Sequence, residues 1–267
     1  VALLAGFPVV VRSRSESGAE GLVAQVSKNL AKRVERGKLD AAARDNALGR
    51  LTVTTQLVDL SGCAIVIESV IEDKDQKIAL LRELDGVMPE SSIIATNTST
   101  LPVSELALAT SHPDRVCGIH FFNPATTMPL VEVIRPLTAN QATIDVALSF
   151  VRACGKDAVL VRDDAGFIVN ALLFPYLNNA IKLMERGTAS IDDIDTAMKG
   201  GCNFPMGPFA LLDLVGLDTS LSIIETLHAA SGNPADAPAA SLVRLVADGH
   251  LGRKTGRGFH TYENRTY

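Results

Sequence analysis

The chain has 267 residues, of which 47% are hydrophobic and 21% charged, and its net charge is −5. This length suffices for two modest domains, and the composition excludes a disordered chain. An acidic balance and only 4% aromatic residues exclude a basic or base-stacking surface, so we expect no nucleic-acid or membrane partner. The four cysteines form no Cys-x-x-Cys pair, and no apolar run has the length of a membrane span, which favours a reducing cytoplasm.

The first two-thirds of the chain alternates short β-like runs with helical patterns. Most of the β-like runs are rich in Val and Ile, as expected for strands buried on both faces of a parallel sheet. The predicted strands are residues 9–11, 51–54, 64–70, 92–96, 116–119, 130–134 and 158–161. Helical patterns cover residues 72–84 and 142–154. This alternation predicts an α/β, Rossmann-like, doubly wound parallel sheet.

A helical hairpin is predicted as an insertion into this sheet, over residues of about 19–49. Apolar residues recur every four positions from Leu22 to Val34, Gly37 ends the run, and Asp40 can cap a second short helix. The hairpin also carries basic residues of the kind that usually form a solvated helix face. These are Lys28, Lys32, Arg33 and Lys38.

The last third of the chain has no β pattern. Residues 166–186 form one long helical pattern, and Ser190 is placed to cap the next helix. Residues 205–208 then break the chain, Asp218 is predicted to start another helix, and residues 234–238 separate the last one. We therefore predict a dinucleotide-binding domain over residues 1–163 and an all-helical domain over residues 164–267.

The phosphate-binding motif of a dinucleotide fold is missing from this sequence. Such folds open with a strand followed by Gly-x-Gly-x-x-Gly, and the nearest glycine cluster, residues 252–258, has the wrong spacing. Residues 1–6 instead read as part of the first helix. The missing strand would be central, and its absence would leave two apolar strand edges open. We hypothesise that the natural protein has a further N-terminal segment.

The chemically most informative residues are a histidine and a glutamate at two predicted strands. His120 follows one apolar run, and Glu132 lies inside the next, where a charge is costly to bury unless it is paired. A carboxylate on one imidazole nitrogen leaves the other nitrogen free to accept a proton, and it stabilises the imidazolium afterwards. The pair suits proton removal from an alcohol.

Four segments together resemble the 3-hydroxyacyl-CoA dehydrogenase family, in its 3-hydroxybutyryl-CoA dehydrogenase branch. They are residues 96–100, 120–124, 130–134 and 166–170, and the resemblance covers about residues 3–262. It implies an oxidoreductase that interconverts (S)-3-hydroxyacyl-CoA and 3-oxoacyl-CoA by hydride transfer to or from NAD or NADP. The second domain has more apolar helix surface than one small helical domain needs, so we predict a homodimer through these helices, consistent with the family. The hairpin would close over the acyl carrier, where its cations could meet phosphate.

The resemblance also implies the site residues. The catalytic set is His120, Glu132, Ser99 and Asn170, and the cofactor-binding set is Ser13, Arg14, Glu72, Lys77, Asn97, Asn123 and Lys254. NAD-binding folds have an Asp or Glu at the strand end where Ser13 stands, and the family mostly uses NAD. A carboxylate there would repel a 2′-phosphate, whereas Ser13 beside Arg14 would accept one, so NADP and NAD are about equally favoured. His260 stands where the family usually has Tyr.

Other readings of the sequence stay open. The acyl carrier is CoA or an acyl carrier protein, since the motifs do not separate them. A gulonate-type hydroxyacid dehydrogenase would share the two-domain plan. A non-catalytic, crystallin-like member would fit the missing glycine loop, but it would not require His120, Glu132, Ser99 and Asn170 together.

Overall fold

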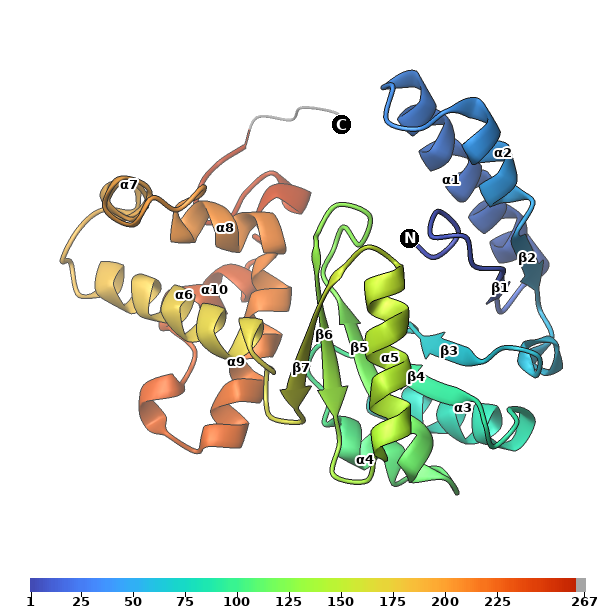
Figure 1. Cartoon of the computed structure of the whole chain (residues 1–267). Coiled ribbons are helices and arrows are strands. Elements are labelled where there is room, and N and C mark those ends of the chain that lie inside the picture. The colour runs from blue at the N-terminus through green and yellow to red at the C-terminus, as the bar shows by residue number, and fades with distance from the viewer. Residues whose placement is uncertain (263–267) are drawn as a thin grey trace. The chain divides into compact units, whose positions relative to one another are not determined.

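The computed structural model describes residues 1–262, and the chain divides into two compact units (Figure 1). The first unit is Val1–Asp163, and the second begins at Asp164. The first unit is built around parallel β-structure and the second is helical, so the fold class predicted from the sequence is confirmed.

Strands form at all seven predicted places. They are β1 (Val9–Arg12), β2 (Leu51–Thr54), β3 (Ile65–Glu68), β4 (Ile93–Thr96), β5 (Val116–Phe121), β6 (Leu130–Arg135) and β7 (Asp157–Arg162). β1 and β2 pair in parallel, and the other five form a sheet in the order β3-β4-β5-β6-β7. The β5–β6 ladder is antiparallel, because only a short loop, too short for a parallel crossover, joins these strands.

The predicted single sheet is divided into two. Among the described residues, β1 pairs only with β2, and β3 only with β4. A cavity of about 1240 Å³ lies between them, lined by apolar side chains of both strands and by Phe150. The open strand edges expected from the sequence are therefore present. Residues 1–6, expected to be helical, form turns, because Gly6 takes a φ of +92° and Pro8 follows shortly.

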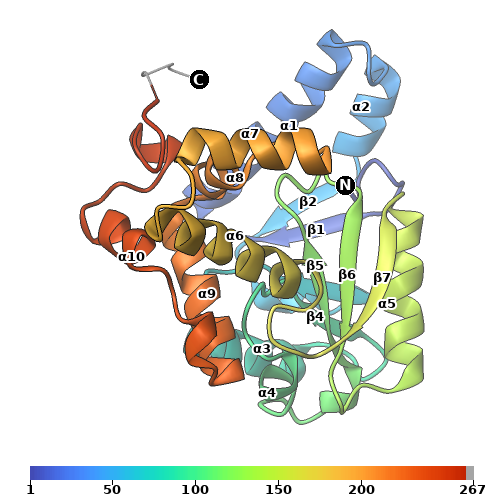
Figure 2. The same cartoon turned by 90° about the vertical axis from the view of Figure 1, so that its left-hand side faces the viewer.

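The first unit has the predicted helices and one short helix, α4, that was not predicted. They are α1 (Glu16–Glu35), α2 (Ala41–Leu48), α3 (Lys74–Val87), α4 (Val103–Ala107) and α5 (Gln141–Ala153), with 3-10 turns η1 (Leu57–Leu60) and η2 (Pro113–Arg115). α1 and α2 lie side by side as a hairpin (Figure 2). The Asp40 side chain accepts a hydrogen bond from the Ala43 N–H at 2.6 Å, which confirms the predicted cap. α1 starts earlier than expected because Ser15 caps it.

Two apolar cores hold the five-stranded sheet. On one face α5 lies along β5, β6 and β7, and Ile144, Ala147 and Val151 form its buried stripe (Figure 1). On the other face, α3 and α4 pack against β4 and β5 through a second cluster that includes Leu84 and Leu106. The sheet is thereby covered on both faces, which leaves the strand ends as the accessible parts.

The second unit is all-helical, as predicted. It contains α6 (Val169–Glu185), α7 (Ile191–Cys202), α8 (Pro208–Val215), α9 (Leu217–Ser231) and α10 (Ala240–Ala247), with 3-10 turns η3 (Pro234–Asp236) and η4 (Arg253–Thr255). Ser190 caps α7 by accepting from the Asp193 N–H at 3.1 Å, as expected. α9 begins at Leu217, one residue before the predicted start.

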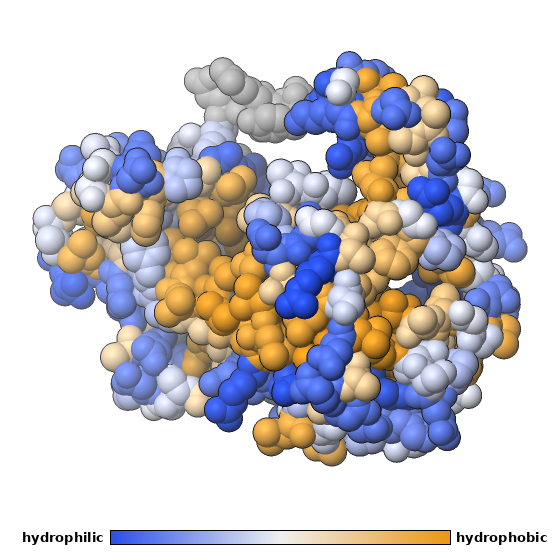
Figure 3. Space-filling view, in the orientation of Figure 1, coloured by the Kyte–Doolittle hydropathy of each residue, from blue (hydrophilic) through white to orange (hydrophobic). Residues whose placement is uncertain are grey.

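The second unit exposes large apolar side chains. Leu172 on α6 is 72% exposed and Leu214 on α8 is 50% exposed. Hydrophobic side chains gather over the region of α6 in the space-filling view (Figure 3). Among residues 1–262, no helix combines the length and the apolar character that a bilayer crossing requires.

Candidate active site

A buried histidine–glutamate pair joins β5 to β6. The antiparallel register places His120 directly opposite Glu132. His120 Nδ1 lies 2.8 Å from Glu132 Oε2, and the two residues are only 4% and 1% exposed. A carboxylate at this distance and depth needs a charge-assisted partner, and it holds the imidazole in one orientation. The geometry expected from the sequence is therefore present.

Ser99 contacts the other nitrogen of the same imidazole. It follows the carboxyl end of β4, and its Oγ lies 3.1 Å from His120 Nε2. When the Nδ1–H donates to Glu132, Nε2 carries the lone pair and accepts a hydrogen bond from the Ser99 hydroxyl. Because ligands of doubly wound sheets bind at the carboxyl ends of the parallel strands, Ser99 and His120 lie where a substrate is expected.

Glu72 holds the loop that carries Ser99. One of its oxygens, Oε1, accepts from the N–H groups of Ser99 at 2.8 Å and Thr100 at 3.1 Å, and from the Thr98 hydroxyl. Burial raises the pKa of Glu72, but the Thr98 and Ser99 hydrogen bonds and the Lys77 charge outweigh it and lower that pKa. Glu72 is therefore a carboxylate, and its side chain keeps 37% of its surface exposed.

Lys77 lies deeper than the expected cofactor contact requires. Its side chain is fully buried, with Nζ 2.8 Å from Glu68 Oε1 and 3.4 Å from Glu72 Oε2. Protein groups enclose the ammonium, so Lys77 reaches the surface of the site only through Glu72. Glu68 was not predicted as a site residue, although it is a charge at the end of the apolar strand Ile65–Glu68.

Asn97 and Asn123 lie beside the histidine in different ways. The Asn97 side-chain oxygen accepts from the Phe121 N–H at 2.8 Å, so it fixes the backbone immediately after His120. Asn123 is exposed in the loop that follows, next to Phe122, whose ring centroid lies 4.6 Å from that of His120. Asn97 thus has a structural partner in the site, while Asn123 stays accessible.

Ser13 and Arg14 lie just beyond the carboxyl end of β1. The Ser13 N–H continues the ladder by donating to the Thr54 carbonyl at 2.9 Å. Arg14 is exposed, and its guanidinium donates to the side-chain oxygen of Gln76 on α3 at 3.3 Å. This strand end therefore carries a hydroxyl and a guanidinium.

Asn170 and Lys254 belong to the second unit. Asn170 lies in the first turn of α6 and is 7% exposed; Phe167, just before this helix, takes a φ of +54°. Lys254 lies in η4, and its ammonium donates to both oxygens of Asp218 at 2.6 Å. Each residue therefore has a defined place within its own unit.

The second unit holds another histidine–carboxylate contact. His260 Nε2 lies 3.0 Å from Asp195 Oδ2, and Asp195 also accepts from the Phe209 N–H at 2.8 Å. The neighbouring carboxylate, Asp213, is 1% exposed and accepts from the Phe259 N–H and the Tyr262 hydroxyl. We call these side chains the terminal clasp: His260, Asp195, Asp213 and Tyr262.

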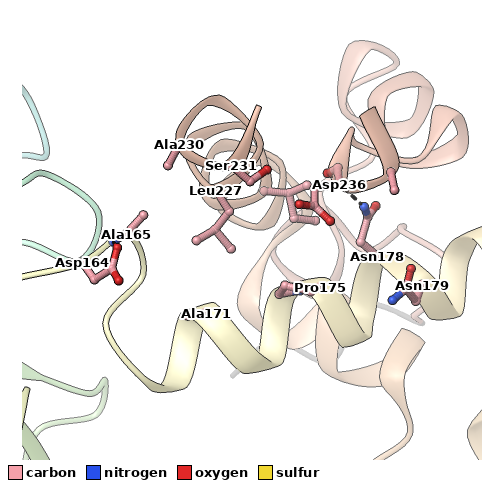
Figure 4. A pocket seen from close by; sticks show the side chains of 12 residues that line it. Asp164, Ala165, Ala171, Pro175, Asn178, Asn179, Leu227, Ala230, Ser231 and Asp236 are labelled. Carbon is pink, nitrogen blue, oxygen red and sulfur yellow. Dashed lines mark hydrogen bonds between the residues drawn. The ribbon is translucent and has the colours of Figure 1, made fainter. Parts of the chain in front are cut away.

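A small cavity of about 270 Å³ also lies in the second unit, between α6, α9 and η3 (Figure 4). Polar side chains from Asp164, Asn179, Ser231 and Asp236 contribute to its lining. Asn178, at its edge, donates to the Ala237 carbonyl at 3.0 Å and so ties α6 to the segment after η3. None of the predicted site residues lines this cavity.

Comparison with known proteins identifies the class of dehydrogenase. Residues 1–164 match the 3-hydroxyacyl-CoA dehydrogenase NAD binding domain, and residues 166–262 match the 3-hydroxyacyl-CoA dehydrogenase C-terminal domain. The chain therefore belongs to the 3-hydroxyacyl-CoA dehydrogenase family.

Its relatives include proteins named 3-hydroxybutyryl-CoA dehydrogenase, which confirms the predicted branch. The one from Mycobacterium tuberculosis is 42% identical over 98% of this chain and 92% of its own length. Human mitochondrial hydroxyacyl-coenzyme A dehydrogenase is 41% identical over 95% of this chain and 81% of its own length. The structure of (S)-3-hydroxybutyryl-CoA dehydrogenase from Ralstonia eutropha matches with a TM-score of 0.96 and 39% identity, over 98% and 93% of the two chains.

Proposed function

We propose that this protein interconverts (S)-3-hydroxyacyl-CoA and 3-oxoacyl-CoA, with His120 as the general acid–base. The observation that carries the proposal is the contact between His120 Nδ1 and Glu132 at 2.8 Å, with Ser99 at the opposite nitrogen. A structural histidine needs no such orientation toward the carboxyl ends of the strands.

The protein groups act on the substrate hydroxyl as follows. In oxidation, His120 Nε2 takes the proton of the 3-hydroxyl, and the Glu132 carboxylate stabilises the imidazolium that forms. Ser99 hydrogen-bonds the same oxygen while its charge changes, and it keeps the hydroxyl on the Nε2 side. In the reductive direction, protonated His120 returns the proton. These steps account for about 10²–10⁴ in rate, the usual range for general acid–base catalysis.

A nicotinamide cofactor fits the residues at the carboxyl ends of β3 and β4. The exposed part of the Glu72 carboxylate can accept ribose hydroxyl hydrogen bonds, and Asn123 is accessible beside His120. When bound, the cofactor supplies the hydride acceptor or donor. These residues contact the nicotinamide half of the cofactor.

The finer features of the proposal concern cofactor, carrier and assembly. Ser13 and Arg14 leave the end of β1 without a carboxylate, which favours acceptance of NADP as well as NAD. The exposed Lys28 and Lys32 on α1 are suitable partners for the phosphates of CoA. The exposed Leu172 and Leu214 support a homodimer through the second unit. The roles implied for Asn170 and Lys254 stay predictions of the family resemblance.

Activity assays test this function and separate it from the alternatives. We expect reduction of acetoacetyl-CoA with NADH or NADPH, and loss of that activity in His120→Ala. Equal or better activity with an acetoacetyl carrier protein would identify the carrier as protein-bound. Turnover of gulonate but not of acetoacetyl-CoA would contradict the proposal, and so would a folded protein that binds either cofactor but turns over neither substrate.

A further inference from the structure

A buried ion pair, Glu68–Lys77, lies directly behind the carboxylate that holds the Ser99 loop. The Lys77 ammonium lies 2.8 and 3.0 Å from the two Glu68 oxygens and 3.4 Å from Glu72 Oε2. Glu68 is 3% exposed and Lys77 is fully buried. One cation is therefore shared by two carboxylates, one wholly buried and one at the edge of the site.

The buried carboxylate is fixed by two neighbouring strands. Glu68 ends β3 and accepts from the Val70 N–H at 2.6 Å, while the Thr96 hydroxyl at the end of β4 donates to it at 2.7 Å. With these partners and Lys77, Glu68 is held from both strands of the ladder. The position of the ammonium is thus set by the sheet and not by the flexible lysine side chain.

The second carboxylate, Glu72, links Lys77 to the loop that carries Ser99. Glu72 has one oxygen toward Lys77, and its other oxygen accepts the N–H groups of Ser99 and Thr100. The Ser99 hydroxyl then lies 3.1 Å from His120 Nε2. A continuous series of contacts therefore links the sheet to the proposed base: the Lys77 ammonium contacts Glu72, Glu72 holds the Ser99 loop, and Ser99 contacts His120.

Stability alone does not account for a buried ion pair at this place. Replacing such a pair by well-packed apolar side chains is often neutral or stabilising. The pair lies at the carboxyl ends of β3 and β4, where ligands bind in this class of fold. A second buried pair of the same unit, Arg115–Asp85 at 2.7 Å, precedes β5 and so lies at the other end of the sheet. It provides a matched control.

We propose that Glu68 and Lys77 are positioning residues, which fix Glu72 and thereby aim the Ser99 hydroxyl at His120. The expected effect on kcat rests on the function proposed above. The expected effect on the position of the Ser99 loop does not. Neither Glu68 nor Lys77 needs to touch substrate for this role.

Hydrogen exchange at single amides, read by NMR on the full chain, tests the mechanical part. In Lys77→Met and Glu68→Gln we expect exchange of the Ser99 and Thr100 amides at least tenfold faster, because their acceptor is no longer fixed. Exchange of the Ser111 amide, which donates to Asp85 at 2.6 Å, should stay within twofold. Asp85→Asn should give the reverse pattern. Unchanged exchange at Ser99 and Thr100 in a folded Glu68→Gln protein would overturn the proposal.

Kinetics test the catalytic part. We expect Glu68→Gln to lower kcat about tenfold, with KM for acetoacetyl-CoA within threefold, while Asp85→Asn leaves both unchanged. Adding Glu68→Gln to Ser99→Ala should then lower kcat by less than twofold, because residues that act through one another are not additive. A full tenfold further loss would show that Glu68 acts by another route and would overturn the proposal.

The two parts fail in distinguishable ways. If the unaltered protein turns over no acyl-CoA, the proposed function fails, and the exchange pattern still decides whether Glu68 and Lys77 hold the Ser99 loop. If the protein is active but the exchange pattern does not appear, the positioning role fails and the proposed function stands.

Discussion

Two buried or half-buried histidine–carboxylate contacts among residues 1–262, one in each unit, have nearly the same length and different surroundings. His120–Glu132 spans 2.8 Å and His260–Asp195 spans 3.0 Å. His120 is 4% exposed and meets Ser99 with its second nitrogen, whereas the His260 side chain is 26% exposed and Asp195 is also held by backbone N–H groups. In the proposed function, the contact of the second imidazole nitrogen with Ser99 and the position at the strand ends distinguish His120 from His260.

Removal of each imidazole gives the largest expected difference between them. His120→Ala should lower kcat by about 10²–10⁴, the usual contribution of a general acid–base group. His260→Ala, the matched control, should change kcat by less than threefold. The measurement is steady-state reduction of acetoacetyl-CoA at saturating cofactor. Equal losses of kcat in His120→Ala and His260→Ala would contradict a special role for His120.

Neutralising each carboxylate gives the next largest difference. Glu132→Gln should lower kcat about 10²-fold, because the imidazole loses both its orientation and the charge that stabilises its protonated form. Asp195→Asn should leave kcat within threefold but lower stability by about 1–3 kcal/mol, since buried donors lose their acceptor. Paired kinetics and urea unfolding check this prediction. A stability loss without a kinetic loss in Glu132→Gln would make that pair structural as well.

How far the sequence predicted these features depends on how local their causes are. The contact between His120 and Glu132 could be predicted because a charge inside the apolar strand Leu130–Arg135 is costly to bury unless it is paired. Asp40 and Ser190 were found because capping depends on three or four neighbouring residues. Glu68 was missed because its partners come from another strand and from a helix, and burial of Lys77 leaves no mark in the spacing. The separation into two sheets depends on which strands pair with one another in the folded chain. Strand pairing is a tertiary property that the local sequence pattern does not give.

The Ser99 loop, which Glu72 holds, and the terminal clasp should lose stability at opposite ends of the pH scale. The Glu72 pKa is lowered in the folded protein, so its stabilising contribution is present above the unfolded pKa of about 4.3 and is lost as pH falls further. Burial and the neighbouring Asp213 charge raise the pKa of Tyr262 to about 12. The stabilising contribution of Tyr262 is therefore fully present below its unfolded pKa of about 10 and is lost as pH rises toward 12.

Thermal unfolding from pH 3 to 12 measures both effects. Glu72→Gln should flatten the loss of stability in acid and leave the alkaline side unchanged, whereas Tyr262→Phe should flatten the alkaline side only. The same residual pH dependence in both variants would mean that other groups control it.

The smallest expected effect on activity concerns assembly, and it compares one exposed leucine from each unit. Leu172 in the second unit is 72% exposed, and Leu137 in the first is 91% exposed. Leu172→Glu should convert a dimer to a monomer in light scattering, because a charge would be buried in the proposed interface. Leu137→Glu should remain dimeric. A monomeric unaltered protein at micromolar concentration would contradict the predicted homodimer.

The central claim is that Glu132 acts through His120 as one acid–base pair, and the double variant His120→Ala with Glu132→Gln tests it most directly. Once the imidazole is gone, the carboxylate can no longer orient the proposed base. The account predicts that kcat of the double variant stays within threefold of that of His120→Ala alone. A further loss of about 10²-fold, equal to that of Glu132→Gln by itself, would mean that the two residues act independently and would contradict the account.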